Sequence, residues 1–218
     1  MGAGIYKSLR VGDREFILGE RCSRVPTDGE CVMKIPAHFK LVYSAAEIAD
    51  ACRKLGQAIT PWAETVSASS GQDLIAVPIL RGGLFFFADL VRAIQTSVEV
   101  APLQTSFYEE GQNNILRSDG GSLPVSVSHF HNRSVLLVDD ICDSGQTLSA
   151  LRPHLLSAGA REVRAAVLVR RLPSALLSFQ PEWTGFDYHG SEWFVGYGME
   201  DSGRWRNLPD VYAIPPAA

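Results

Sequence analysis

The segment from Ser134 to Thr147 constrains this chain more than any other. It reads SVLLVDDICDSGQT, an apolar run that ends in two adjacent aspartates and continues into small residues. The apolar run predicts a buried strand, but packing gives no reason for paired carboxylates at its carboxyl end. In open α/β sheets, ligands bind at that end of the strands. Asp139 and Asp140 are therefore candidate ligand-binding residues.

The turn after these aspartates has the composition of a phosphate site. Ser144, Gly145 and Thr147 lead into a helix that we expect over residues 145–158, with Gly159 as its C-cap. The first N–H groups of a helix and the positive end of its dipole attract anions. The segment thus offers oxygen ligands for sugar hydroxyls or Mg²⁺, and then a cradle for a phosphate. The predicted ligand is a phosphorylated sugar.

The rest of the pattern predicts an α/β fold, a mostly parallel sheet flanked by helices. We expect strands over residues 74–80, 98–107, 135–138 and 162–169. A capping box at Ser44–Glu47 starts a helix that Pro61 limits, and a second helix covers residues 84–94. The expected inner face of that second helix consists of Leu84, Phe87, Leu90, Val91 and Ile94. Strands that alternate with helices are typical of a parallel sheet covered on both faces.

The chain divides by pattern into three parts. Residues 1–38 show no clear periodicity and form an N-terminal extension, and residues 39–172 form the core. Residues 173–218 are irregular and aromatic, and we expect them to form a small hood over the carboxyl edge of the sheet, followed by the C-terminal segment. Residues 109–124 are polar and glycine-rich, which predicts a functional or disordered loop.

Composition excludes several classes of function. The net charge of −4 gives no electrostatic footprint for nucleic acid. No apolar stretch has membrane-spanning length, and residues 1–10 lack the long apolar segment of a secretory signal. The four cysteines, Cys22, Cys31, Cys52 and Cys142, show no metal-binding spacing. We therefore expect reduced thiols in a cytoplasmic protein.

The segment from Asp139 to Thr147 resembles the ribose-phosphate signature of the type I phosphoribosyltransferases. The resemblance implies that Asp139 and Asp140 contact the ribose hydroxyls and bound Mg²⁺. It also implies a 5-phosphate site made by Asp143, Ser144, Gly145, Gln146 and Thr147. Asp143 lies beside the base in this family and is the candidate general base. The implied donor is 5-phosphoribosyl-1-pyrophosphate (PRPP), and pyrophosphate is one product.

Two further segments carry the resemblance. In the family, the turn equivalent to Ile79–Gly83 holds the pyrophosphate, which implies that role for Arg81 and Gly82 and a cis peptide between Leu80 and Arg81. The block from Glu192 to Pro209 is similar to the purine-binding hood of the hypoxanthine-guanine phosphoribosyltransferases. It implies that Trp193 stacks on the purine, with Phe194 and Ile141 beside it. Glu200 reaches a second Mg²⁺ and the base edge, and Arg206 reaches the pyrophosphate.

This sequence departs from the family pattern around the base. Arg170 stands where the family has a lysine that donates to the purine 6-oxo group. Trp193 replaces a Phe or Tyr, and Glu200 replaces an Asp. In the family's lid, a Ser-Tyr pair closes over the pyrophosphate. Here Ser106 is followed by Phe107 and Tyr108, and either ring takes the tyrosine's place.

The resemblance implies a Mg²⁺-dependent purine phosphoribosyltransferase that acts on hypoxanthine or guanine and forms a nucleoside monophosphate. Two alternatives stay open. The same chemistry could use xanthine or another purine-like base, or the fold could serve a regulatory protein that senses PRPP and binds RNA. The acidic balance and the retained Asp143 favour the enzyme. Family members commonly assemble, so a homodimer or homotetramer is implied.

Overall fold

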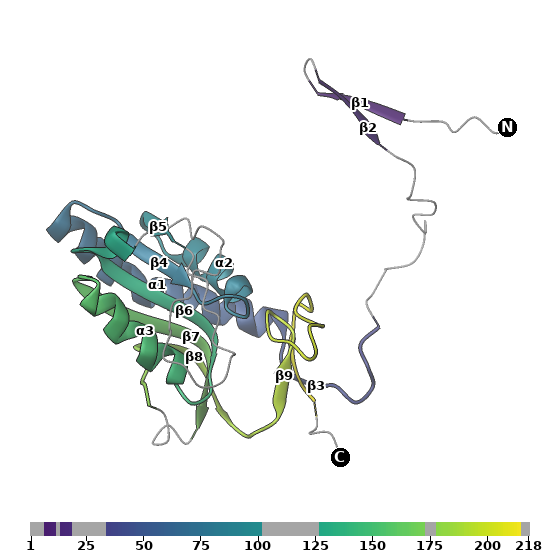
Figure 1. The fold of residues 1–218 in the computed structure, drawn as a ribbon. Helices are drawn as coiled ribbons and strands as arrows, with labels where there is room; N and C mark the ends of the chain where they lie inside the picture. Colours follow the sequence, from purple (N-terminus) through teal and green to yellow (C-terminus); the bar gives the residue numbers. More distant parts are fainter. Residues whose placement is uncertain (1–6, 12–13, 19–33, 102–126, 173–177, 215–218) are drawn as a thin grey trace. The chain divides into compact units, whose positions relative to one another are not determined.

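The computed structural model of the chain describes residues 7–11, 14–18, 34–101, 127–172 and 178–214. The chain forms two compact units, residues 1–36 and 37–218. In the first unit, β1 (Lys7–Val11) and β2 (Arg14–Leu18) pair as an antiparallel hairpin. All other described elements belong to the second unit (Figure 1).

A five-stranded parallel sheet forms the centre of the second unit. Its strands are β4 (Leu74–Pro78), β5 (Val98–Val100), β6 (Ser134–Cys142), β7 (Glu162–Leu172) and β8 (Trp183–His189). They lie in the order β5-β4-β6-β7-β8, and every neighbouring pair is parallel. The central strands β4 and β6 are apolar on both faces because helices cover both faces. The predicted fold class is confirmed.

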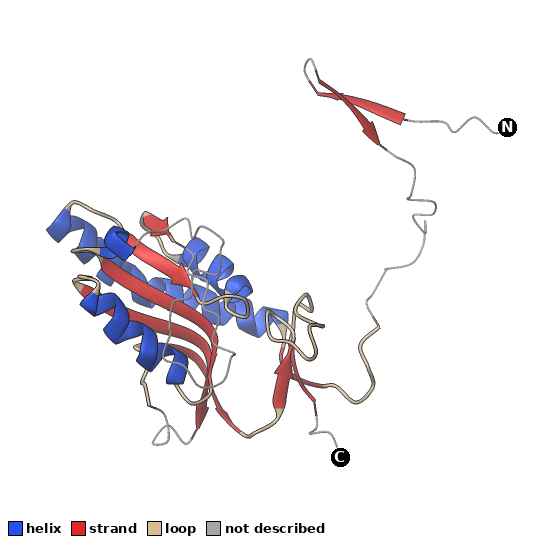
Figure 2. Ribbon diagram, viewed as in Figure 1, coloured by secondary structure: helices blue, strands red, loops and turns tan. Residues whose placement is uncertain are grey.

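Side chains that alternate along the strands build two core layers, one on each face of the sheet, and Figure 2 shows helices on both of these faces. Leu136 and Val138 of β6 pack in one cluster with α1 (Ala45–Ser70) and α2 (Leu84–Ala93). Val135 and Leu137 pack on the opposite face against α3 (Gln146–Ser157). The sheet is thus a buried middle layer between the helices.

Helix α1 begins as predicted but does not end at Pro61. Ser44 is its N-cap, with Glu47 completing the capping box. The helix continues for nine more residues after Pro61, although proline has no N–H for the helical ladder. Trp62 and Val66 lie beyond the proline and are buried in the core. Their packing holds the helix together where the local pattern predicts its end.

Helix α2 ends one residue before the predicted end, and its inner face differs from the predicted one at Leu84 and Phe86. Phe86, Phe87 and Leu90 are buried, whereas Leu84 is exposed at the helix start. The helix contains five consecutive hydrophobic or aromatic side chains around that start, so the apolar stripe is too wide to be assigned from spacing. The buried face is set by the fit against β4 and β6, and the prediction for Leu84 is wrong.

A second, antiparallel sheet forms the hood. It consists of β3 (Lys40–Tyr43), β10 (Val211–Ile214) and β9 (Trp193–Val195) in that order. Strand β3 comes from the start of the segment predicted as core, residues 39–172, whereas β8, from the segment predicted as hood, is the edge strand of the main sheet. The hood therefore combines residues near 40 with residues after 192. One further element, the short 3₁₀ helix η1 (Val127–Phe130), precedes β6.

The strand order places a switch point between β4 and β6. After β4 the chain passes through α2 to β5 on one side, and β6 then returns to the other side of β4. The segments that leave β4 and β6 diverge to opposite faces, which opens a crevice at their carboxyl ends. Residues 79–82 and 143–147 border that crevice.

Candidate active site

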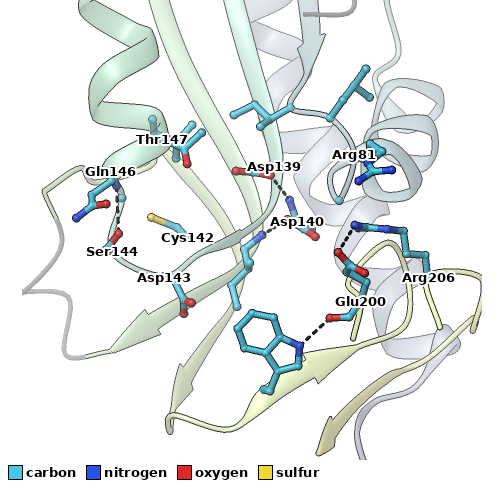
Figure 3. A pocket seen from close by; sticks show the side chains of 17 residues that line it. Arg81, Asp139, Asp140, Cys142, Asp143, Ser144, Gln146, Thr147, Glu200 and Arg206 are labelled. Carbon is cyan, nitrogen blue, oxygen red and sulfur yellow. Dashed lines mark hydrogen bonds and ion pairs between the residues drawn. The ribbon is translucent and has the colours of Figure 1, made fainter. Parts of the chain in front are cut away.

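A cavity of about 620 Å³ lies at the carboxyl ends of β4 and β6 (Figure 3). The turn after β4, the end of β6, the start of α3 and the hood all contribute to its walls. Its lining residues are Ile79, Leu80, Arg81, Gly82, Asp139, Asp140, Ile141, Cys142, Asp143, Ser144, Gly145, Gln146, Thr147, Leu148, Trp193, Glu200 and Arg206. A second cavity of about 530 Å³ shares six of these residues and adds Arg171, Phe194 and Met199.

The turn into α3 has the geometry that a phosphate cradle needs. Gly145 has φ of 74°, a left-handed conformation that glycine adopts at little cost. A Cβ there would also lie 2.8 Å from the backbone nitrogen of Phe179. Ser149 N–H donates to the Gly145 carbonyl at 2.9 Å, so the helix starts directly after the glycine. The helix start predicted at Gly145 is confirmed, and it faces the cavity.

Asp139 and Asp140 are paired and buried at the end of β6. Their residues are 9% and 8% exposed. Asp140 N–H donates to Asp139 Oδ1 at 3.0 Å, and Ile141 N–H donates to Asp140 Oδ1 at 2.9 Å. Burial raises the pKa of both carboxyls, and the charge of Asp140 raises the pKa of Asp139 further. Both groups would gain from a cation in the cavity.

These carboxylates fit Mg²⁺, which prefers hard oxygen ligands and is bound by few protein groups together with substrate phosphates. Within the described ranges, no group of three or more His, Cys, Asp or Glu side chains is placed to hold a metal ion. The carboxylate of Glu200 forms an ion pair with Arg206 Nη2 at 2.9 Å. A metal role for Glu200 therefore stays a prediction.

The turn after β4 packs tightly against the end of β6. The peptide bond between Leu80 and Arg81 is cis, as the resemblance implied. Ile79 N–H donates to the Val138 carbonyl at 2.8 Å, which ties the turn to β6. A Cβ on Gly82 would overlap the Asp140 carboxylate. This position therefore requires glycine, and Arg81 beside it faces the cavity (Figure 3).

The hood closes the opposite side of the cavity. Trp193 is 55% exposed, and its indole Nε1–H donates to the Glu200 carbonyl at 2.7 Å. Phe194 is buried behind it. In the loop that follows, Gly198 has φ of 102°, and a Cβ there would overlap the Gly82 carbonyl. The hood and the turn after β4 therefore meet backbone to backbone.

Arg170 does not lie where the resemblance implied. Its Nε and Nη2 donate to the two carboxylate oxygens of Asp187 at 2.7 and 2.9 Å, and Nη1 donates to Gln180. Arg170 lies beside Asp187 in the register of β7 and β8. It lines neither cavity described above, so its side chain is directed away from the base side of the site.

Arg171 occupies the place expected of Arg170. Its Nε forms an ion pair with Asp143, and Nη1 and Nη2 donate to the carbonyls of Gly190 and Glu192 at 2.7 and 2.9 Å. The guanidinium also lies 4.8 Å from the centre of the Phe194 ring. Sequence reasoning missed this residue. Neighbouring side chains in a strand point to opposite faces of the sheet, so the Arg170-Arg171 pair indicates one cation on each face.

The other predicted site residues divide into two groups. Ile141, Ser144, Gln146 and Thr147 all line the larger cavity, as predicted. The proposed lid residues Ser106, Phe107 and Tyr108 lie outside the described residues.

No helix in the described ranges is long and apolar enough to cross a membrane.

The five-stranded parallel sheet and the cavity at the carboxyl ends of β4 and β6 together define a phosphoribosyltransferase. The phosphoribosyl transferase domain model matches residues 46–201, most of the chain and all of the cavity except Arg206. The protein therefore belongs to the phosphoribosyltransferase family.

Within that family, the chain is similar to purine enzymes. It is 31% identical over 194 residues to the hypoxanthine-guanine phosphoribosyltransferase of Mycobacterium tuberculosis, covering 87% of this chain and 93% of the relative. It is 33% identical over 166 residues to the hypoxanthine phosphoribosyltransferase of Escherichia coli, covering 76% and 89%. A crystal structure of a hypoxanthine phosphoribosyltransferase from Staphylococcus aureus matches with a TM-score of 0.66 at 25% identity. It covers 81% of this chain and 91% of that one.

Proposed function

We propose that this protein is a purine phosphoribosyltransferase that transfers the 5-phosphoribosyl group of PRPP to N9 of hypoxanthine or guanine. The observation that carries the proposal is the joined cavity. Buried carboxylates and the turn into α3 lie on one side of it, and the aromatic side chains of Trp193 and Phe194 lie on the other. The relatives named above support the purine as acceptor.

The donor half of the cavity fits PRPP group by group. The N–H groups at the start of α3 and the hydroxyls of Ser144 and Thr147 would receive the 5-phosphate. Asp139 and Asp140 would accept from the ribose hydroxyls and hold Mg²⁺. Arg81 and Arg206 would face the pyrophosphate, which needs positive charge as it leaves.

The base half selects by its pattern of donors and acceptors. Arg171 only donates hydrogen bonds, and an ionised Asp143 only accepts them. Their ion pair therefore presents a donor next to an acceptor. A 6-oxopurine offers the complement, an acceptor at O6 beside a proton at N7. A 6-amino group would instead place its own N–H against the guanidinium, which disfavours adenine.

The residues also fit the transfer step. As the C1–O bond of PRPP breaks, positive charge develops at C1 and negative charge on the leaving pyrophosphate. Bound Mg²⁺ would offset that negative charge. Arg81 and Arg206 add fixed donors to the same group. N9 of the purine forms the new bond to C1, and Asp143 accepts the proton that the base sheds. The aromatic side chains of Trp193 and Phe194 keep the base in line with C1.

The test is a panel of bases with PRPP and Mg²⁺. Hypoxanthine and guanine are expected to give pyrophosphate and the nucleoside monophosphate, and adenine is expected to react far more slowly. Absence of turnover on both 6-oxopurines would reject the proposal. Turnover on xanthine alone would favour the runner-up acceptor, which the departures at Trp193 and Glu200 motivate.

We further propose that the protein is cytoplasmic and a homodimer or homotetramer. Reduced cysteines and the assemblies common in the family support these two statements. Cys52 and Cys142 are both free thiols in the structure. Light scattering after gel filtration would test the assembly, and a monomer at working concentration would contradict it.

A further inference from the structure

The indole N–H of Trp193 has a partner inside the site. It donates to the main-chain carbonyl of Glu200 at 2.7 Å, across the hood from β9 to the loop that follows it. The Trp193 ring is 55% exposed and lines both cavities. A Phe or Tyr side chain, which the family pattern has here, carries no N–H at that place. The contact is therefore a property of the tryptophan.

Glu200 connects this contact to the opposite half of the cavity. Its carbonyl accepts from Trp193, and its carboxylate forms the 2.9 Å ion pair with Arg206 Nη2. The carboxylate also accepts from Gly203 N–H. One residue is thus held on the base side through its main chain and on the pyrophosphate side through its side chain.

Arg206 completes the connection. Its Nη1 donates to the Gly198 carbonyl, and Gly198 lies against the Gly82 carbonyl in the turn after β4. In Figure 3, the guanidinium of Arg206 lies above Glu200 on the same side of the cavity as Arg81. A shift of the Glu200 loop would therefore move a cation that the donor needs.

From these contacts we propose that Trp193 is a positioning residue for donor binding, in addition to stacking on the base. Its N–H fixes the Glu200 loop, and through Glu200 it fixes the guanidinium of Arg206. The inference rests on the proposed function, because it takes Arg206 as a pyrophosphate contact. It predicts an effect on PRPP binding that stacking of the Trp193 ring on the base does not produce.

The test compares Trp193→Phe with the wild type by calorimetric titration of PRPP with Mg²⁺ in the absence of base. Phenylalanine keeps an aromatic face and removes the N–H. The dissociation constant of PRPP is expected to rise about 2- to 10-fold, the effect of losing one hydrogen bond. A ring that only stacks on the base predicts no change, because no base is present.

Trp62→Phe is the matched control. It removes another indole N–H, the one that donates to Glu162 Oε2 at 3.0 Å, and neither residue lines a described cavity. Its PRPP affinity should equal that of the wild type. Melting temperatures of both variants show whether each is folded during the titration.

A double-mutant cycle with Glu200→Gln tests the route of the effect. Glutamine keeps the carbonyl that Trp193 binds but loses the charge that holds Arg206. In that background, Trp193→Phe should change the PRPP dissociation constant by less than about 2-fold. Equal PRPP affinity in wild type and Trp193→Phe, or additive effects in the cycle, would overturn the inference. Failure of the wild type to bind PRPP would instead reject the proposed function.

Discussion

Gly82 lies against the carboxylate of Asp140 so closely that no side chain fits between them. The contact joins the turn after β4 to the end of β6, and both border the cavity. It fixes the distance between the groups proposed for the pyrophosphate and for the ribose. A buried carboxylate that accepts a hydrogen bond from Ile141 N–H yields less easily to a methyl group than a flexible side chain would.

Gly82→Ala should therefore weaken PRPP binding by at least about 10-fold, since moving Asp140 disturbs several donor contacts at once. Calorimetric titration with PRPP and Mg²⁺ measures this. Gly71→Ala is the control: Gly71 has φ of 66° but open space around it, so that variant loses stability without a change at the site. Wild-type affinity in Gly82→Ala would contradict the packing argument.

Asp143→Asn should separate binding from chemistry. Asparagine still accepts a hydrogen bond from Arg171 but accepts a proton poorly. We expect PRPP affinity within about 2-fold of the wild type and a fall in kcat of about 10²- to 10⁴-fold, the usual contribution of a general base. Steady-state rates with hypoxanthine measure the loss. Near-normal turnover would remove Asp143 from the proton transfer.

Arg171 and Arg170 form a matched pair for testing base recognition. Arg171→Met should raise the KM for hypoxanthine by about 10-fold or more and narrow the preference for hypoxanthine over adenine, because the donor facing O6 is gone. Arg170→Met should leave the KM unchanged, since Arg170 pairs with Asp187 outside the cavity. Initial rates on both bases measure the effects. The reverse result would restore the base contact to Arg170.

The buried pair at the end of β6 predicts a pH dependence of stability. Burial and the neighbouring charge raise the pKa of Asp139 in the folded protein above its value of about 3.9 in an unfolded chain. The unfolded state therefore loses its proton first as pH rises above about 4. The free energy of unfolding of the ligand-free protein then falls until Asp139 also ionises in the folded state.

Asp139→Asn removes the ionisable group, and with it this loss in the free energy of unfolding. At pH 7.5 the ligand-free variant should melt higher than the wild type by about 2–4 °C, the shift that 1 kcal/mol produces in a domain of this size. The difference should vanish near pH 4. Scanning calorimetry across that range measures it. A variant that melts lower at neutral pH would show that the Asp139 carboxylate already has a stabilising partner.

The donor half of the site was predictable from sequence because local rules determine it. A buried strand, two aspartates and a small-residue turn into a helix occupy one continuous segment, and their geometry follows from strand and helix starts. The cis peptide at Leu80–Arg81 was predictable only through resemblance. The confirmed capping box at Ser44 is likewise a local feature.

The base half was less predictable because it depends on a change of side-chain alternation in β7. Leu168 and Val169 are neighbours in sequence, yet both pack in the cluster with α1 and α2. Strict alternation would have put them on opposite faces. After this change, Arg171 and not Arg170 reaches the base side. The continuation of α1 past Pro61 likewise depends on core packing beyond the local pattern.

The position of Asp139 and Asp140 within β6 bears on how this enzyme can evolve. β6 is the middle strand of the sheet, held by β4 on one side and β7 on the other, so a change at its end also disturbs the core. Trp193 belongs to a separate three-stranded sheet, is 55% exposed and lies outside the core clusters, so it can vary while the core stays intact. Selection can therefore exchange the acceptor base much more readily than the sugar donor.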